Sequence, residues 1–105
     1  MKLTVKNNSE VLEKEALNII YKASDLVNID NIDSLNIEES YIVGKPESLL
    51  SEDPEIPEMV TAHSGMLDND RIFIIVTDVV DPNINCTTIY AVIIILKDQS
   101  NIILK

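Results

Sequence analysis

The sequence predicts a single α+β domain in which one long N-terminal helix packs on a mostly antiparallel sheet of about five or six strands. Three observations predict this fold class. An apolar stripe with helical period crosses residues 9–27, segments rich in β-branched residues follow residue 58, and turn-forming residues separate those segments. The chain has 105 residues, which suffices for one hydrophobic core but not for two.

The N-terminal elements follow from a change of hydrophobic period. Residues 2–6 alternate polar and apolar side chains, which predicts a short strand with one wet face. From Leu12 to Val27 apolar residues recur three or four positions apart, as on one side of an amphipathic helix. Asn8 or Ser9 can cap this helix at its N-terminus.

The middle of the chain predicts a strand at residues 40–44, followed by a mobile acidic loop at residues 45–58. Pro54 and Pro57 prevent regular helix there and favour an extended connection.

The C-terminal half predicts four further strands. Residues 58–63, 71–80 and 86–97 are rich in β-branched side chains, and a shorter segment ends at residues 102–104. Turn-forming residues at 81–85 predict an antiparallel hairpin, and a second turn completes a meander of three strands. The predicted order is therefore β-α-β-β-β-β-β.

Both faces of the C-terminal strands are predicted to be dry, because Ile72 and Ile74 alternate with Phe73 and Ile75. One helix covers only one face of a sheet, so a second cover is needed. Another protein or a second copy of the chain can supply it. The alternative is the middle segment, whose apolar residues are Ile29, Ile32, Leu35, Ile37, Leu49, Leu50 and Ile56.

The excess negative charge is concentrated in one segment. The formal net charge is −10 at pH 7, and residues 30–58 contain half of the 18 acidic residues but only one base, Lys45. Such a surface repels nucleic acid and anionic lipid, so direct contact with either is not expected, whereas a basic protein is attracted. Small inhibitors and immunity proteins cover basic enzyme sites in this way, an analogy of charge alone. The residues assigned to the binding surface are Glu47, Glu52, Asp53, Glu55 and Glu58.

The sequence predicts a soluble, cytoplasmic protein without membrane contact. Its longest apolar run, residues 89–96, is shorter than the roughly 18 residues that a spanning helix needs, and its first residues lack the hydrophobic stretch of a signal peptide. Cys86 is the only cysteine, which fits a reducing compartment. We expect this side chain to be buried at the start of a strand.

The stretch HSGMLDND at residues 63–70 contains the only histidine of the chain. Its composition predicts a turn, in which Gly65 and the Asp and Asn residues adopt left-handed φ and form local hydrogen bonds. Neighbouring residues on an extended chain point to opposite faces, so His63 and Ser64 are not by themselves a catalytic pair.

Two hypotheses of function follow. The leading one is a non-enzymatic acidic protein that binds another protein, either as an inhibitor or as the subunit of a homo-oligomer. The alternative is a small hydrolase or metal-dependent enzyme that uses His63 with Asp68, Asp70 and Asp78. Asp78 lies in an apolar segment, either at the wet end of a strand or buried beside Arg71 or His63. We expect no cofactor and no metal site, because the calcium-loop, zinc, phosphate-loop and G-x-S-x-G patterns are all missing.

Overall fold

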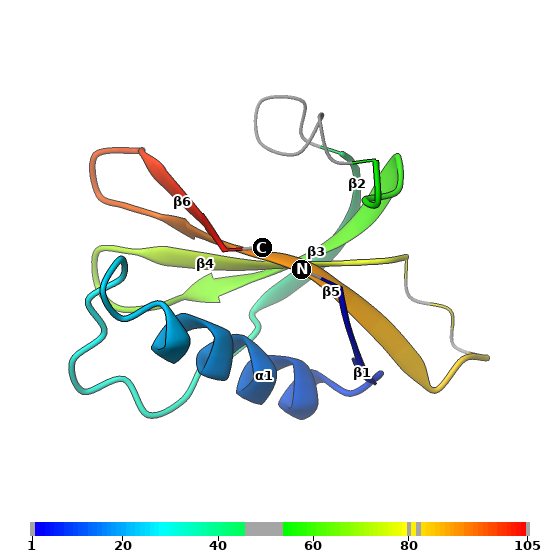
Figure 1. Cartoon of the computed structure of the whole chain (residues 1–105), viewed down its shortest axis with the longest axis horizontal. Helices are drawn as coiled ribbons and strands as arrows, with labels where there is room; N and C mark the ends of the chain where they lie inside the picture. The colour runs from blue at the N-terminus through cyan, green and yellow to red at the C-terminus, as the bar shows by residue number, and fades with distance from the viewer. Residues whose placement is uncertain (1, 46–53, 80, 82, 105) are drawn as a thin grey trace.

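The structure is a computed structural model that describes residues 2–45, 54–79, 81 and 83–104. In that part of the chain one helix and six strands follow one another in the predicted order (Figure 1). They are β1 (Leu3–Lys6), α1 (Ser9–Lys22), β2 (Glu39–Gly44), β3 (Met59–Met66), β4 (Ile72–Thr77), β5 (Cys86–Ile95) and β6 (Asn101–Leu104). An α+β fold with an antiparallel sheet is therefore confirmed. Most of the predicted loop at 45–58 lies outside the described residues.

The strands form one sheet in the order β1-β5-β4-β3-β2, and every described pair is antiparallel. β5 is long enough to serve two neighbours on one edge, since β1 pairs with its residues 86–89 and β6 with its residues 92–95. β4, β5 and β6 are the predicted meander. At the other end of the sheet, β2 is the outermost strand (Figure 1).

The helix is shorter than predicted. Asn8 caps it as expected, because its side-chain oxygen accepts hydrogen bonds from two backbone N–H groups of the first turn. α1 has 14 residues and ends at Lys22, and Ala23 is its C-cap. The serine and aspartate at 24–25 are weak helix formers, which accounts for the early end. A hydrogen bond of 2.9 Å from the backbone N–H of Val27 to the carbonyl oxygen of Ala23 then turns the chain back.

One face of the sheet is covered by α1 and by the segment that follows it (Figure 1). Ile29, Ile32 and Leu35 pack on this side, so these three residues do not cover the opposite face, which was one of the two predicted alternatives. The cause is the early end of the helix, which leaves residues 27–35 to close the same core. The buried residues of this helix-side core are Leu12, Ala16, Ile20, Val27, Ile29, Ile32, Leu35, Leu67, Phe73, Ile75, Ile89, Val92, Ile94 and Leu104.

The opposite face, which we call the second face, has a buried centre and an open rim. Ile56 of the middle segment is 4% exposed and covers part of the centre, whereas Leu49 and Leu50 lie outside the described residues. The centre consists of Ile56, Val60, Val76, Tyr90, Ala91 and Ile93. At the rim the side chains of Tyr41 and Ile72 remain 42% and 37% exposed.

Cys86 begins β5 as predicted, but its side chain is exposed and not buried as expected, because Thr87 takes the inward position at the start of the strand. Among the described residues no helix has the length and apolar character to cross a membrane.

Candidate functional site

The stretch at residues 63–70 is only partly a turn. β3 continues to Met66, so His63 and Gly65 belong to a strand. No described glycine has a positive φ, and the predicted left-handed conformation is therefore wrong for Gly65. Position 65 needs a glycine because its neighbours leave no room for a side chain. A Cβ atom at this position would lie 2.2 Å from the carbonyl oxygen of Asn36 and 2.9 Å from two ring atoms of Phe73.

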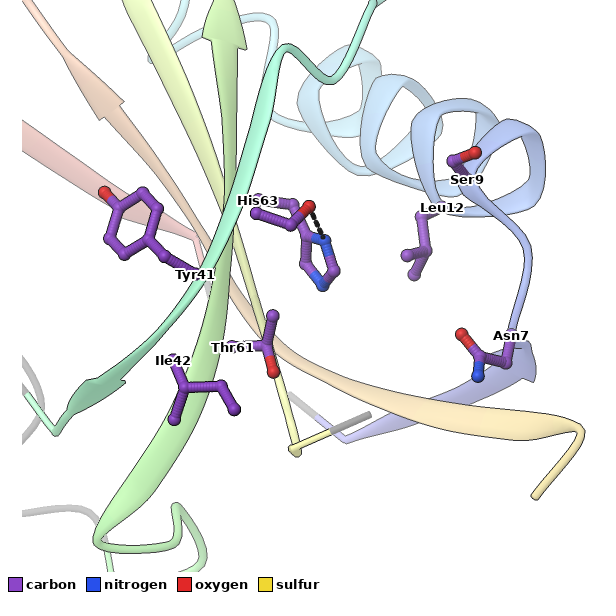
Figure 2. Close-up of a pocket in the computed structure, with 8 residues that line it drawn as sticks. Asn7, Ser9, Leu12, Tyr41, Ile42, Thr61 and His63 are labelled. Atoms are coloured by element: carbon purple, nitrogen blue, oxygen red, sulfur yellow. Dashed lines mark hydrogen bonds between the residues drawn. The ribbon is translucent and has the colours of Figure 1, made fainter. Parts of the chain in front are cut away.

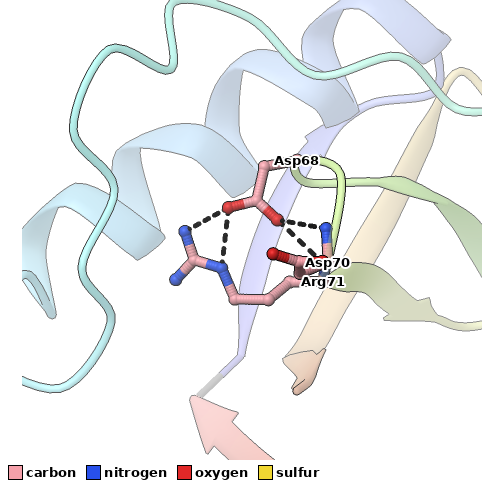
Figure 3. A network of polar contacts seen from close by, with 3 residues as sticks. All are labelled: Asp68, Asp70 and Arg71. Atoms are coloured by element: carbon pink, nitrogen blue, oxygen red, sulfur yellow. Dashed lines mark hydrogen bonds and ion pairs between the residues drawn. The ribbon is translucent and has the colours of Figure 1, made fainter. Parts of the chain in front are cut away.

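The turn itself begins at Leu67 and is organised by the Asp68 carboxylate (Figure 3). One oxygen accepts hydrogen bonds from the backbone N–H groups of Asp70 and Arg71 at 3.0 and 2.9 Å. The other accepts from Nε and Nη2 of the Arg71 side chain at 2.9 and 2.7 Å. The predicted local hydrogen bonds are therefore present, without left-handed φ. Hydrogen bonds from the Arg71 guanidinium lower the pKa of the Asp68 carboxyl, and both of its oxygens accept hydrogen bonds within the turn.

His63 lies apart from this turn, on the helix side of the sheet, between side chains of the two neighbouring strands. Its Nδ1 is 2.8 Å from the hydroxyl oxygen of Ser40 on β2 (Figure 2). Its Nε2 is 2.9 Å from the hydroxyl oxygen of Thr77 on β4. Ser40 stands directly opposite His63 in the register of β2 and β3, whereas Thr77 stands opposite Thr61 and is reached diagonally.

The hydrogen bonds that join Ser40, His63 and Thr77 assign the tautomer of the imidazole. The Thr77 hydroxyl donates its one proton to the carbonyl oxygen of Asp78 at 2.9 Å, so it accepts from Nε2–H of His63. Nδ1 then carries no proton and accepts the hydroxyl proton of Ser40. His63 is only 5% exposed, and its burial lowers the pKa of the imidazole. The result is a neutral base beneath an exposed serine hydroxyl.

A pocket of about 570 Å³ opens above these residues, between the first turn of α1 and strands β2 and β3 (Figure 2). It is lined by Asn7, Ser9, Leu12, Ser40, Tyr41, Ile42, Thr61 and His63. Thr61 differs from the other polar residues of the lining. Its side chain is 4% exposed, yet its hydroxyl has no hydrogen-bond partner among the described residues.

The acids named with His63 in the enzyme hypothesis are not joined to it. Both ring nitrogens are occupied by hydroxyl groups, and Asp68 is held by Arg71. Asp78 is half-buried and binds neither Arg71 nor His63 through its carboxylate, since it accepts hydrogen bonds from the Thr87 hydroxyl and the backbone N–H of Thr88. Within the described ranges, no three His, Cys, Asp or Glu side chains gather as metal ligands.

The outer edge of β2 is a second candidate site. The backbone N–H of Lys45 donates to the carbonyl oxygen of Glu58 at 2.7 Å, so the odd-numbered residues of β2 bond to β3. Just before the strand the alternation is broken, because the N–H of Glu38 donates to the carbonyl oxygen of Ser64 at 2.8 Å. Peptide groups alternate in direction along an antiparallel strand, and those of Ser40, Ile42 and Gly44 therefore point away from the sheet. The Ile42 side chain beside them is 58% exposed.

Acidic residues flank this edge. Glu38 and Glu39 lie exposed at the start of β2, and Glu55 and Glu58 lie exposed just before β3. The other three residues of the predicted binding surface, Glu47, Glu52 and Asp53, lie outside the described residues. On the second face a groove of about 300 Å³ runs beside the edge, lined by Tyr41, Val43, Gly44, Val60, Ala62, Ile74, Val76 and Ile93.

Sequence reasoning did not find Ser40 or Thr77 as partners of His63. The connection between β2 and β3 is no tight hairpin, so turn chemistry does not fix the register that places Ser40 opposite His63. The one available signal is the position of the histidine itself, which shares the inward side of β3 with Thr61.

No protein-family model matches the chain, and no curated protein or solved structure matches it with significance.

Proposed function

We propose that this acidic protein works by binding another protein, and that its partner adds an extended segment to the outer edge of β2. The observation that carries the proposal is the set of outward peptide groups at Ser40, Ile42 and Gly44, on a strand without proline or lysine. Lysines and prolines are two of the devices by which natural sheets protect an edge, and β2 has neither, although Glu39 at its start is charged. Such an edge is suited to binding by strand addition.

The side chains of β2 support strand addition on both faces. Tyr41 points to the second face and is 42% exposed, and Ile42 points to the helix side and is 58% exposed (Figure 2). A partner strand would cover both and place its own side chains beside the apolar groove. Each well-covered large apolar side chain stabilises a complex by about 1.5–3 kcal/mol before the cost of ordering the partner.

The charges favour a basic partner. Glu38, Glu39, Glu55 and Glu58 surround the edge, and the whole chain carries a net charge of −10. Opposite charge speeds the encounter of two proteins and selects against acidic competitors. An extended segment that alternates basic and apolar residues fits this edge best.

A short peptide of alternating lysine and valine tests the proposal, with fluorescence anisotropy as the measurement. We expect it to bind, and to bind less tightly when salt rises from about 50 to 300 mM. Ile42→Pro removes an outward N–H without removing a bond to β3, and should abolish binding. Ile42→Thr keeps that N–H and should retain binding. Equal binding of a glutamate–valine peptide, or unchanged binding by Ile42→Pro, would overturn the proposal.

A second copy of the chain is the other candidate partner. When two β2 strands pair antiparallel about a two-fold axis through Ile42, Glu39 of each copy stands opposite Lys45 of the other, and Tyr41 stands opposite Val43. Light scattering distinguishes this pairing. A dimer that is lost in Ile42→Pro would favour a second copy, and a monomer at every protein and salt concentration would exclude it.

A further inference from the structure

The pocket beside His63 contains a chemistry that protein binding does not use. An exposed hydroxyl, that of Ser40, donates its proton to a buried neutral imidazole at 2.8 Å. This is the arrangement in which a serine becomes a nucleophile, because the adjacent base removes its proton as it attacks. Thr77 holds the imidazole in the required tautomer by accepting Nε2–H.

The Thr61 hydroxyl lies outside this arrangement. It is buried without a partner in the part of the chain that the structure describes, and its oxygen is closed off from the pocket. The methyl group of Thr61, not its hydroxyl, lies toward His63 (Figure 2).

We propose that this pocket is an esterase site, in which Ser40 is the nucleophile and His63 the general base. The substrate class is a small uncharged ester. No charged side chain belongs to the described lining, whereas Leu12 and Ile42 offer apolar contact to an acyl chain. The first turn of α1, with Ser9, faces the strands across the pocket (Figure 2), and the positive end of the helix dipole favours negative charge there.

The reaction balances with these groups and one water molecule. Ser40 Oγ forms a bond to the carbonyl carbon while its proton moves to Nδ1 of His63, and the π electrons move to the carbonyl oxygen. Collapse of this intermediate breaks the bond to the alcohol oxygen, which takes the proton from Nδ1. Water then loses a proton to Nδ1 and attacks the acyl-serine, and the released Ser40 oxygen takes that proton back.

Pairing of two copies through β2 leaves the Ser40 hydroxyl open. In the symmetric pairing about Ile42, the residue opposite Ser40 is Gly44 of the other copy, which has no side chain to cover the hydroxyl. An extended partner with a side chain at that position would cover it, so acylation is measured on the protein without a partner.

Acylation by p-nitrophenyl acetate tests the proposal on the whole chain. We expect release of p-nitrophenolate and one acetyl group on Ser40, located by peptide mass spectrometry after an acid quench. Ser40→Ala should lose both. Ser64→Ala is the matched control, since it removes a neighbouring hydroxyl on the other side of β3, and it should keep both. An unchanged rate in Ser40→Ala, or acetyl groups only on lysines, would overturn the proposal.

Variants of the supporting residues separate chemistry from folding. His63→Gln should slow acylation by about 10²-fold or more. Thr77 is a positioning residue, so Thr77→Ser should rescue the rate that Thr77→Val loses. Urea midpoints confirm that each compared variant is folded. Equal rates in folded wild type and His63→Gln would overturn the proposal.

Discussion

Residues 63–66 and 67–70 are adjacent in the sequence, but they use their polar groups in opposite ways. His63 bonds to Ser40 and Thr77 while it is 5% exposed, so both hydrogen bonds act in a medium of low polarity. Asp68 makes four hydrogen bonds to its own turn, where its side chain is 37% exposed. Burial therefore decides how much each group contributes to the free energy of unfolding. Loss of a hydrogen-bond partner of the buried His63 costs about 1–3 kcal/mol. The exposed ion pair of Asp68 contributes only about 0–1 kcal/mol.

The largest expected effect is that of Gly65→Ala. The new Cβ atom would lie 2.2 Å from the carbonyl oxygen of Asn36 and 2.9 Å from the Phe73 ring, and backbone cannot move away as a flexible side chain can. We expect the free energy of unfolding to fall by about 3 kcal/mol or more, measured by urea denaturation.

Gly44→Ala is the matched control for this substitution, because a Cβ atom there has nothing within 4 Å. It should change stability by less than about 1 kcal/mol, in either direction. A similar small change in Gly65→Ala would mean that the segment at Asn36 lies farther from β3 than the structure places it.

The contrast at Gly65 shows where sequence reasoning succeeds and where it fails. Periodicity predicted β1 and the helix, and β-branched composition between turn-forming residues predicted the later strands, since both signals are local properties of the chain. The predicted length of α1 was wrong because the apolar stripe continues past the weak helix formers at 24–25 into a segment that packs without being helical. The predicted role of Gly65 was wrong because it depends on Asn36, which reaches β3 from a distance in the sequence. The pairing of Ser40 with His63 is likewise a property of register, which local sequence does not encode here.

Two threonines that stand opposite each other in β3 and β4 give the next largest contrast. Thr77→Val removes the acceptor of Nε2–H and leaves a buried donor without a partner, so we expect a loss of about 1–3 kcal/mol. Thr61→Val removes a hydroxyl that has no described partner, so stability should be unchanged or slightly higher. Urea denaturation of both variants measures the difference. Equal losses would show that the Thr61 hydroxyl is satisfied in solution.

Acid should distinguish the two halves of the stretch by the pH at which each loses stability. Burial lowers the pKa of His63 below the ordinary value of 6.5, so the unfolded chain binds the proton first. The stability that His63 contributes is complete above pH 6.5 and is lost as pH falls below it, with a slope of at most about 1.4 kcal/mol per pH unit. The pKa of Asp68 lies below its ordinary value of 3.8, so its smaller contribution persists down to that pH and is lost only in stronger acid.

Urea denaturation between about pH 7.5 and 4.5 should therefore show the stability difference between wild type and His63→Gln shrinking below pH 6.5, while that between wild type and Asp68→Asn stays constant. A constant difference for His63→Gln over the same range would contradict a buried, neutral imidazole, and with it the tautomer that places a base beside Ser40.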